Sequence, residues 1–167
     1  LSKFGATFKL KNKKNLHLTI YAAKTLKPIS YIEKKGSAQC KSAVIFAGMK
    51  ANGKTFIKAK KSRNHTELMC KYLKLPIKVK NKANYDLISI EKVKKIKPFN
   101  YKIPSDISSS AFFIVLAVLS EKSKLVIKDV NINPSRIGII TILIKMGAKI
   151  IFKNLKIYKG EKLADIK

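Results

Sequence analysis

Arginine is nearly absent from this chain, although basic residues are abundant. Of 37 lysines and arginines among 167 residues, only Arg63 and Arg136 are arginines. Such a bias suggests that lysine is accepted wherever any cation serves, and that arginine is kept where a planar, permanently charged fork is needed. Forks of this kind bind carboxylates and phosphates. The two arginines are therefore the first candidates for function. For each, pairing with a structural carboxylate or a helix C-terminus is the alternative.

Cysteines and long apolar runs are scarce as well. The two cysteines, Cys40 and Cys70, stand in no CxxC pair and at no metal-ligand spacing. We therefore expect buried structural thiols in a reducing compartment, which favours a cytoplasmic protein without a metal site. The longest apolar run, 111–119, is too short to span a membrane and predicts a buried helix. We recognise no signal or transit segment.

Only nine residues are acidic, which leaves a formal net charge of +28. Such a charge would favour nucleic acid or an anionic membrane as partner. The lysines are spread through every segment, however, so we interpret them as a solvated coat that favours small anionic substrates. A nucleic-acid-binding module is the alternative, and it predicts exposed aromatic residues among the lysines. We expect no nucleic acid, because the aromatics stand in apolar runs typical of a core. They are Phe46, Phe56, Phe112 and Phe113.

One signature occurs three times at equal spacing, beginning at Leu1, Tyr72 and Leu143. Each copy is typical of the last turn of a helix, a Gly or Pro break and the entry into a strand. A fixed period indicates a duplicated unit that buries its sheet against its own two helices. The unit is predicted to run strand, helix, strand, helix, strand, strand. The fold class is therefore α/β, with about two βαβαββ units.

The first full copy is predicted to hold strands near 26–32, 55–59, 77–81 and 86–90 and helices near 37–51 and 64–73. The second copy, from about Phe99, is predicted to hold a helix at 105–119, a strand at 124–129 and a helix whose first turn suits Pro134.

The boundary between two structural bodies is predicted at the polar, Pro-bearing stretch 103–106, which separates 1–103 from 104–167. We expect the second copy to be cut short, with residues 164–167 opening a strand. The first residue is not Met and falls within an apolar pattern, so we expect a piece of a longer protein.

Ser37-Ala38-Gln39 is predicted to open the first long helix. A helix start presents unpaired N–H groups and the positive end of the helix dipole, so it is a natural anion site. Ser37 adds a hydroxyl, and Gln39 adds both a donor and an acceptor. An ordinary N-cap is the alternative for Ser37.

The second helix is predicted to open with Ser62-Arg63-Asn64-His65-Thr66-Glu67. Ser62 or Asn64 can cap it, and Glu67 can close a capping box. Capping leaves Arg63 unexplained, because a cation at the positive end of a helix opposes the dipole unless an anion is present. His65, as a lone histidine, is more often a structural or hydrogen-bonding residue than a catalyst.

These two polar blocks are the most specific sequence features of the chain. Together with three further blocks of the chain, and in the same order and spacing, they resemble the middle of the 5-enolpyruvylshikimate-3-phosphate synthase family, in its bacterial class II form. The blocks that carry the resemblance are 36–43 with 46–49, 62–67, 103–113, 133–136 and 146–148.

The resemblance implies a two-lobed enolpyruvyl transferase fold of six βαβαββ units, each lobe an inverse α/β barrel. Residues 1–103 would belong to the first lobe and 104–167 would start the second. It also implies a transferase of the shikimate pathway, which serves chorismate and aromatic amino-acid biosynthesis. That enzyme moves the enolpyruvyl group of phosphoenolpyruvate to the 5-hydroxyl of shikimate 3-phosphate, without metal or organic cofactor. We expect the parent protein to be monomeric.

The resemblance also assigns roles to single residues. Those that match Ser37, Ala38 and Gln39 hold shikimate 3-phosphate, and the glutamine also reaches phosphoenolpyruvate. Ser62 and Arg63 match residues at the phosphate of shikimate 3-phosphate, with His65 nearby. Arg136 matches a motif that we treat as mainly structural.

The chain departs from the family pattern in three places. Pro-Gly-Asp is here Pro104-Ser105-Asp106, which would stiffen a hinge. Arg-Asp-His is Arg63-Asn64-His65, and Asn-Pro-Thr-Arg-Thr-Gly is here the run 133–138, which differs at Ser135 and Ile137. The family's acid–base residues, and the arginine that binds phosphoenolpyruvate, match nothing here, so no catalytic residue is predicted and the chain alone is expected to be inactive. The fold-related alternatives are a UDP-sugar enolpyruvyl transferase, whose reactive-cysteine loop we do not recognise, and an RNA-end cyclase.

Overall fold

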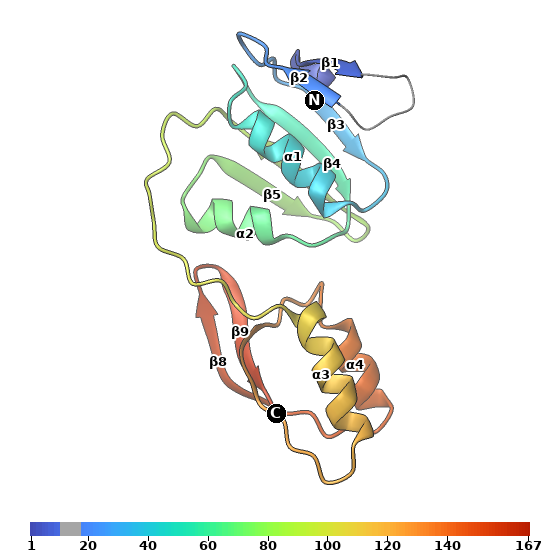
Figure 1. Ribbon diagram of the computed structural model, residues 1–167. Helices are drawn as coiled ribbons and strands as arrows, with labels where there is room; N and C mark the ends of the chain where they lie inside the picture. Colours follow the sequence, from blue (N-terminus) through green and yellow to red (C-terminus); the bar gives the residue numbers. More distant parts are fainter. Residues whose placement is uncertain (11–17) are drawn as a thin grey trace. The chain divides into compact units, whose positions relative to one another are not determined.

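The computed structural model describes residues 1–10 and 18–167, and the chain divides into two compact units (Figure 1). Unit 1 comprises Leu1–Lys97 and unit 2 comprises Pro98–Lys167. Each unit has a hydrophobic core of its own, so each is described by itself.

Unit 1 has the predicted element order. Its elements are η1 Ser2–Phe4, β1 Thr7–Leu10, β2 Leu18–Tyr21, β3 Ser30–Glu33, α1 Ala38–Gly48, β4 Thr55–Lys60, α2 His65–Tyr72, β5 Ile77–Asn81 and β6 Tyr85–Ile90. The main sheet has the order β3-β4-β6-β5, with β3 parallel to β4 and the other pairs antiparallel. Both helices lie on one side of it (Figure 1). The first predicted strand, 26–32, is reduced to β3 and an isolated bridge at Leu26.

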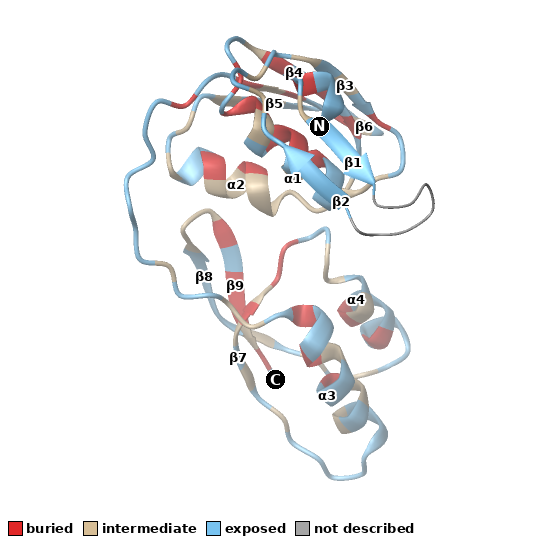
Figure 2. Ribbon diagram, turned by 45° about the horizontal axis from the view of Figure 1, so that its top comes forward, coloured by how far each residue is buried: buried red, intermediate tan, exposed pale blue. Residues whose placement is uncertain are grey.

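The core of unit 1 lies between the sheet and its two helices. Residues of β4 alternate strictly between buried and exposed, so only one face of the sheet is covered. Helix α1 approaches that face closely at Gly48, where a Cβ would lie 2.6 Å from Ile90 Cγ2 and 3.1 Å from Thr55 Cβ. Figure 2 shows the buried residues of α1 and, in contrast, the exposed pair β1 and β2.

Unit 2 repeats this topology. Its elements are α3 Ile107–Leu119, β7 Ile127–Asn131, α4 Gly138–Lys145, β8 Phe152–Tyr158 and β9 Glu161–Ile166. The sheet order is β7-β9-β8, and Ser105 adds a parallel bridge to Val130 in β7. Ser105, β7, β9 and β8 therefore correspond to β3, β4, β6 and β5. The predicted duplication of a βαβαββ unit is confirmed.

Three predicted elements of unit 2 were misplaced. Residues 164–166 end strand β9 rather than opening a strand, so this copy is not cut short. The strand predicted at 124–129 is β7, which begins later. Pro134 lies in a turn before α4, because the Asn133 side chain accepts hydrogen bonds from the backbone N–H and hydroxyl of Ser135, at 3.0 and 2.8 Å. That Asx turn delays the helix to Gly138.

The boundary between the units falls after Lys97 rather than at 103. Residues just before α3 are already held by unit 2, since the Ser105 N–H donates to the Asp129 carbonyl at 3.0 Å and the Lys102 N–H donates to Tyr158 Oη at 3.0 Å. Pro104-Ser105-Asp106 therefore lies within unit 2 and is not the junction. The assignment of the two units to two lobes stays a prediction.

The aromatic residues that the sequence placed in the core are exposed. The exposed fractions are 57% for Phe46, 50% for Phe56, 80% for Phe112 and 61% for Phe113. Helix α3 is apolar on all sides, and a single sheet covers only one of its faces, which buries Ile107 and Ile114. The argument from buried aromatics against nucleic acid was therefore wrong. In the described part of the chain, no helix is long and apolar enough to cross a membrane.

Candidate anion-binding site

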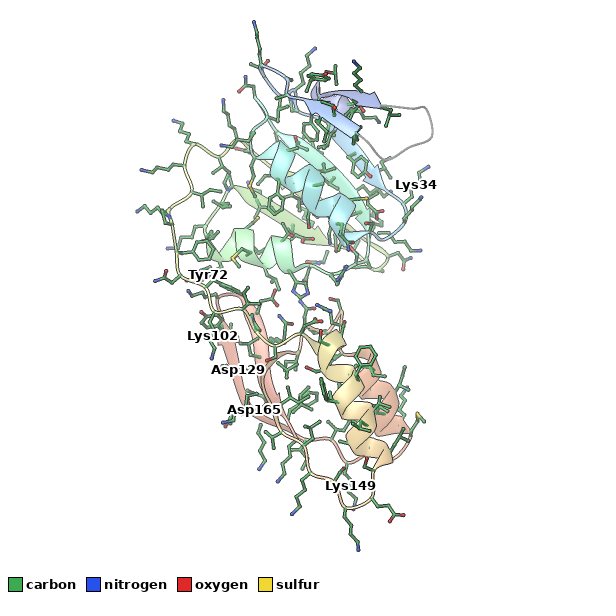
Figure 3. All side chains as sticks on the ribbon, in the orientation of Figure 1. Lys34, Tyr72, Lys102, Asp129, Lys149 and Asp165 are labelled. Atoms are coloured by element: carbon green, nitrogen blue, oxygen red, sulfur yellow. The ribbon has the colours of Figure 1, made fainter. Side chains whose placement is uncertain are left out.

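Two loops of unit 1 begin side by side, at the C-terminal ends of the parallel strands β3 and β4. Strands β3 and β4 are parallel, and Glu33 near the end of one pairs in register with Ala59 near the end of the other. The loop after β3, which contains Lys34 (Figure 3), leads to α1, and the loop after β4 leads to α2. A Cβ on Gly36, whose φ is +75°, would lie 3.3 Å from the Lys61 carbonyl oxygen, so the loops lie side by side. Ligands of α/β sheets bind at such an edge.

The N-terminal turns of α1 and α2 are also tied to each other. The hydroxyls of Ser42 and Thr66 are 2.6 Å apart. The Lys41 ammonium lies 2.6 Å from the Glu67 carboxylate. Both contacts join the first two turns of α1 to the first turn of α2. Two helix N-termini, each with unpaired N–H groups and a positive dipole end, therefore share one edge.

At the start of α1, Ser37 is the N-cap and Ala38 is the first helical residue. The Ser37 hydroxyl accepts a hydrogen bond from the Cys40 N–H at 3.2 Å, so the alternative interpretation of Ser37, an N-cap, is confirmed. A hydroxyl that accepts one bond still carries its own proton as a donor. Gln39 is exposed.

Glu33 supports the loop that leads to Ser37. Its buried carboxylate accepts hydrogen bonds from the N–H groups of Lys35 at 2.9 Å and Gly36 at 2.7 Å. Burial alone would raise the pKa of Glu33, but backbone N–H groups of residues 35–37 and the charge of Lys41 outweigh it and lower the pKa below 4.5. The ionised carboxylate therefore fixes the turn.

At the start of α2, Asn64 takes the N-cap position and His65 is the first helical residue. The predicted capping box is wrong, because no side chain of the described residues caps the N-terminus of α2 and Glu67 is buried against Lys41 instead. The Ser62 hydroxyl is buried and has no hydrogen-bond partner among the described residues. A buried polar group without a partner is costly, so Ser62 is suited to receive a ligand.

The two arginines occupy equivalent places but have different partners. Each follows a serine and stands two positions before the first residue of its helix, α2 or α4. Arg136 Nη2 lies 2.7 Å from Asp106 Oδ1 and donates to Ser108 Oγ at 2.6 Å. Arg63 is half-buried and forms no ion pair with any residue that the structure describes. The expected structural role of Arg136 is confirmed.

Asp106, the partner of Arg136, is the N-cap of α3. Its carboxylate accepts from the Ser109 N–H at 3.1 Å. Burial alone would raise the pKa of Asp106, but the bond from Ser109 and the charge of Arg136 outweigh burial and lower it. In unit 2, then, a built-in carboxylate lies between the helix start and the arginine.

The cysteines were expected to be buried, but only Cys70 is. Its pKa is raised to about 11 by burial and by the charge of Glu67, so it is a thiol at neutral pH. Cys40, in the first turn of α1, is exposed. Among the described residues, no group of three or more His, Cys, Asp or Glu side chains is placed to hold a metal ion.

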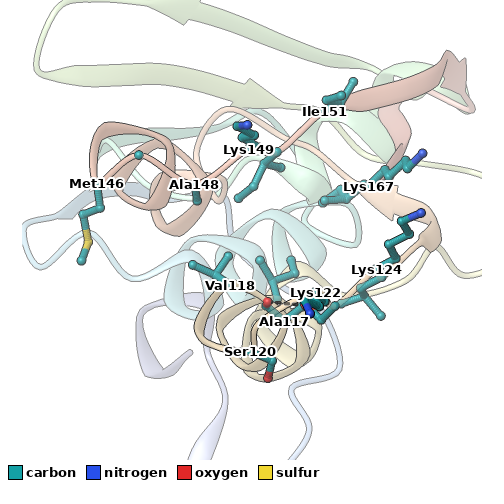
Figure 4. A pocket seen from close by; sticks show the side chains of 16 residues that line it. Ala117, Val118, Ser120, Lys122, Lys124, Met146, Ala148, Lys149, Ile151 and Lys167 are labelled. Carbon is teal, nitrogen blue, oxygen red and sulfur yellow. Dashed lines mark hydrogen bonds between the residues drawn. The ribbon is translucent and has the colours of Figure 1, made fainter.

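A separate hollow of about 570 Å³ lies in unit 2, at the C-terminal ends of α3 and α4 (Figure 4). Its lining includes Val118, Lys124, Met146 and Lys149. None of the predicted site residues lines it, so it is not the candidate site.

Sequence reasoning missed the pairing of Lys41 with Glu67, although a signal was present. Lys41 precedes the buried Val44 and Ile45 by three and four positions, which places its charge on the buried face of α1. A lysine on such a face is almost always paired.

Comparison with known proteins gives one consistent result. The family model described as EPSP synthase (3-phosphoshikimate 1-carboxyvinyltransferase) matches residues 1–165. The 3-phosphoshikimate 1-carboxyvinyltransferase of Caldicellulosiruptor bescii is 45% identical over 168 residues, which cover 99% of this chain and 39% of that protein. The chain thus spans about two fifths of the length of this relative.

Solved structures agree. EPSP synthase from Acinetobacter baumannii matches with a TM-score of 0.81 and 38% identity, over 98% of this chain and 36% of that one. The enolpyruvyl transferase NikO from Streptomyces tendae matches with a TM-score of 0.61 and 13% identity, which supports the fold alone. The predicted enolpyruvyl transferase fold is confirmed, and this chain belongs to the EPSP synthase family, the 3-phosphoshikimate 1-carboxyvinyltransferases.

Proposed function

We propose that this chain supplies half of the binding site for shikimate 3-phosphate in an enzyme of the shikimate pathway. That enzyme transfers the enolpyruvyl group of phosphoenolpyruvate to the 5-hydroxyl of shikimate 3-phosphate and releases phosphate. The proposed ligands of shikimate 3-phosphate are Ser37, Ala38, Gln39, Ser62, Arg63 and His65, and Gln39 would also contact phosphoenolpyruvate. A cytoplasmic location, a monomeric parent and the absence of nucleic acid from its partners stay predictions.

The contrast between the two arginines carries this proposal. In unit 2, Arg136 reaches the N-cap of α3 and the residue two positions further on, Ser108. The equivalent positions in unit 1 are Ser37 and Gln39. Ser37 has no carboxylate, and Arg63 has no acidic partner in the described chain. A bound phosphate would take the place that the Asp106 carboxylate holds in unit 2.

The chemistry of this half-site is binding and electrostatic stabilisation. Two helix N-termini, a guanidinium and two hydroxyls surround a dianionic phosphate with donors only, which suits charge-assisted hydrogen bonds. Donors fixed in this way need no reorganisation when the charge redistributes during transfer. Proton transfer is assigned to no residue of this chain.

The test is a comparison of Arg63→Lys with Arg136→Lys in the full-length enzyme. We expect Arg63→Lys to weaken shikimate 3-phosphate binding by about 1–3 kcal/mol, the scale of a charged hydrogen bond. The fold should persist, because Arg63 forms no ion pair with any described residue that the substitution could break. Arg136→Lys is the matched control and should leave affinity nearly unchanged. Equal affinities for the wild-type enzyme and Arg63→Lys, measured by titration calorimetry, would refute the proposal.

A further inference from the structure

We propose that the buried pair Lys41–Glu67 positions the substrate-binding loops: it fixes the register of α1 against α2 and thereby the spacing between Ser37–Gln39 and Ser62–Arg63. This inference rests on the proposed function. The two residues would be positioning residues, since neither is assigned a contact with substrate.

The pair is fully enclosed. Exposed fractions are 0% for Lys41 and 3% for Glu67, and the charged atoms lie 2.6 Å apart. Lys41 is the fourth residue of α1 and Glu67 the third of α2. Each lies about one turn beyond the residues proposed to bind phosphate. A shift of one helix along the other would therefore move one side of the site relative to the other.

Lys41 also acts on the loop before α1. Its charge helps to lower the pKa of Glu33, and Glu33 holds the N–H groups of Lys35 and Gly36. One ammonium thus lies near two buried carboxylates, one that holds the loop before Ser37 and one in the first turn after Arg63. The Ser42–Thr66 hydrogen bond at 2.6 Å adds a directional link between the helices.

Unit 2 shows that the fold does not require such a pair. The residues at the same positions from the helix starts are Ser110 in α3 and Ile140 in α4, both buried and uncharged. Unit 2 still packs its two helices on a sheet of the same order. The ion pair therefore belongs to the unit whose arginine lacks a built-in carboxylate.

Energetics favour positioning over stability as the role of the pair. Desolvation of two charges offsets most of their attraction, so an apolar pair of similar volume is often neutral or stabilising. Apolar contacts are non-directional, however, whereas two buried charges lose attraction as they separate and have no water to compensate. Small displacements of binding groups are expensive in an active site.

The experiment uses Lys41→Met, Glu67→Leu and the double variant in the full-length enzyme, with shikimate 3-phosphate as the probe. Each single variant should lower the melting temperature, because one buried charge loses its partner. The double variant should regain or exceed the wild-type melting temperature. It should nevertheless keep a KM for shikimate 3-phosphate about tenfold above wild type, as expected for misplaced binding groups.

The matched control is Lys54→Met with Glu91→Leu, which removes an exposed pair at the opposite end of β4. We expect neither the melting temperature nor KM to change appreciably. A double Lys41/Glu67 variant with wild-type KM would overturn the inference while leaving the proposed function intact, provided that Arg63→Lys still loses affinity. If Arg63→Lys also binds normally, the proposed site itself is wrong.

Discussion

At the scale of single residues, what an arginine does here is decided by the carboxylates around it. Asp106 neutralises Arg136 and caps α3 with the same side chain. In unit 2, a carboxylate of the chain itself thus occupies the position where an anion could bind. In unit 1 the nearby carboxylates are already engaged elsewhere: Glu33 by its loop and Glu67 by Lys41. Arg63, at the start of α2, therefore forms no ion pair within the described residues, as the proposed phosphate site requires.

Ser62 should show a conflict between stability and binding. Its hydroxyl is buried without a partner in the described chain, so Ser62→Ala removes a desolvated polar group. We expect the free protein to gain about 1 kcal/mol in unfolding free energy. The full-length variant should bind shikimate 3-phosphate more weakly. Urea denaturation and calorimetry measure the two effects, and a variant that is less stable yet binds normally would contradict this prediction.

Glu33 gives a prediction with a defined pH dependence. Because its pKa in the folded chain lies below the ordinary value of 4.5, its contribution to stability is present above pH 4.5. It is lost as the pH falls through the folded pKa. Glu33→Gln should therefore lower the melting temperature at pH 7 and match the wild type at strongly acidic pH. A melting-temperature difference that stays constant from pH 7 to below the folded pKa would show that the carboxylate charge has no role.

At the scale of elements, hydrophobic periodicity and capping residues were enough to place most helices and strands of unit 1 and to find the repeat. They failed where a tertiary contact competed with a local one. Glu67 could close a capping box locally, but Lys41 engages it. Asn133 builds a turn in which Pro134 cannot start the helix. Periodicity also could not tell that Phe112 would be exposed, because it reveals an apolar face and not what covers it.

The candidate site was predictable only in part, because some of its features depend on local sequence and others on tertiary packing. The opposition between Arg63 and the dipole of α2 is a local argument, and it pointed to an anion. The buried hydroxyl of Ser62 and the pair of Lys41 and Glu67 depend on how two helices pack, and no local pattern fixes that packing. The difference between the arginines became visible only when Asp106 was seen beside Arg136.

The packing of α1 on its sheet yields a prediction at this scale. A Cβ at Gly48 would lie 2.6 Å from Ile90 Cγ2, so Gly48→Ala should destabilise unit 1 by about 1–3 kcal/mol through overpacking. Gly138→Ala, at the first residue of α4, meets nothing within 4 Å and should be neutral or stabilise by up to about 1 kcal/mol. Chemical denaturation compares the two. A smaller loss at Gly48 than at Gly138 would contradict the described packing.

At the scale of the whole molecule, the chain combines a net charge of +28 with helices whose apolar faces are only partly covered. Phe112 and Leu119 of α3 are 80% and 79% exposed. The chain spans 39% of the length of its C. bescii relative. These features describe a segment of a longer type of protein, and the helix starts of unit 1 are the part that we propose takes part in its chemistry.

We therefore predict that the purified 167-residue chain catalyses no transfer. The residues proposed for this chain would bind and orient substrate, and no residue of the chain is assigned the proton transfers that enolpyruvyl transfer requires. Loss of general acid–base catalysis alone typically lowers a rate by about 10²–10⁴-fold. With the chain present, phosphate release from shikimate 3-phosphate and phosphoenolpyruvate should be no faster than in buffer without protein. The full-length enzyme under the same conditions should release phosphate. Release above background, and its loss in an Arg63→Ala variant of the same chain, would place catalytic chemistry within these residues.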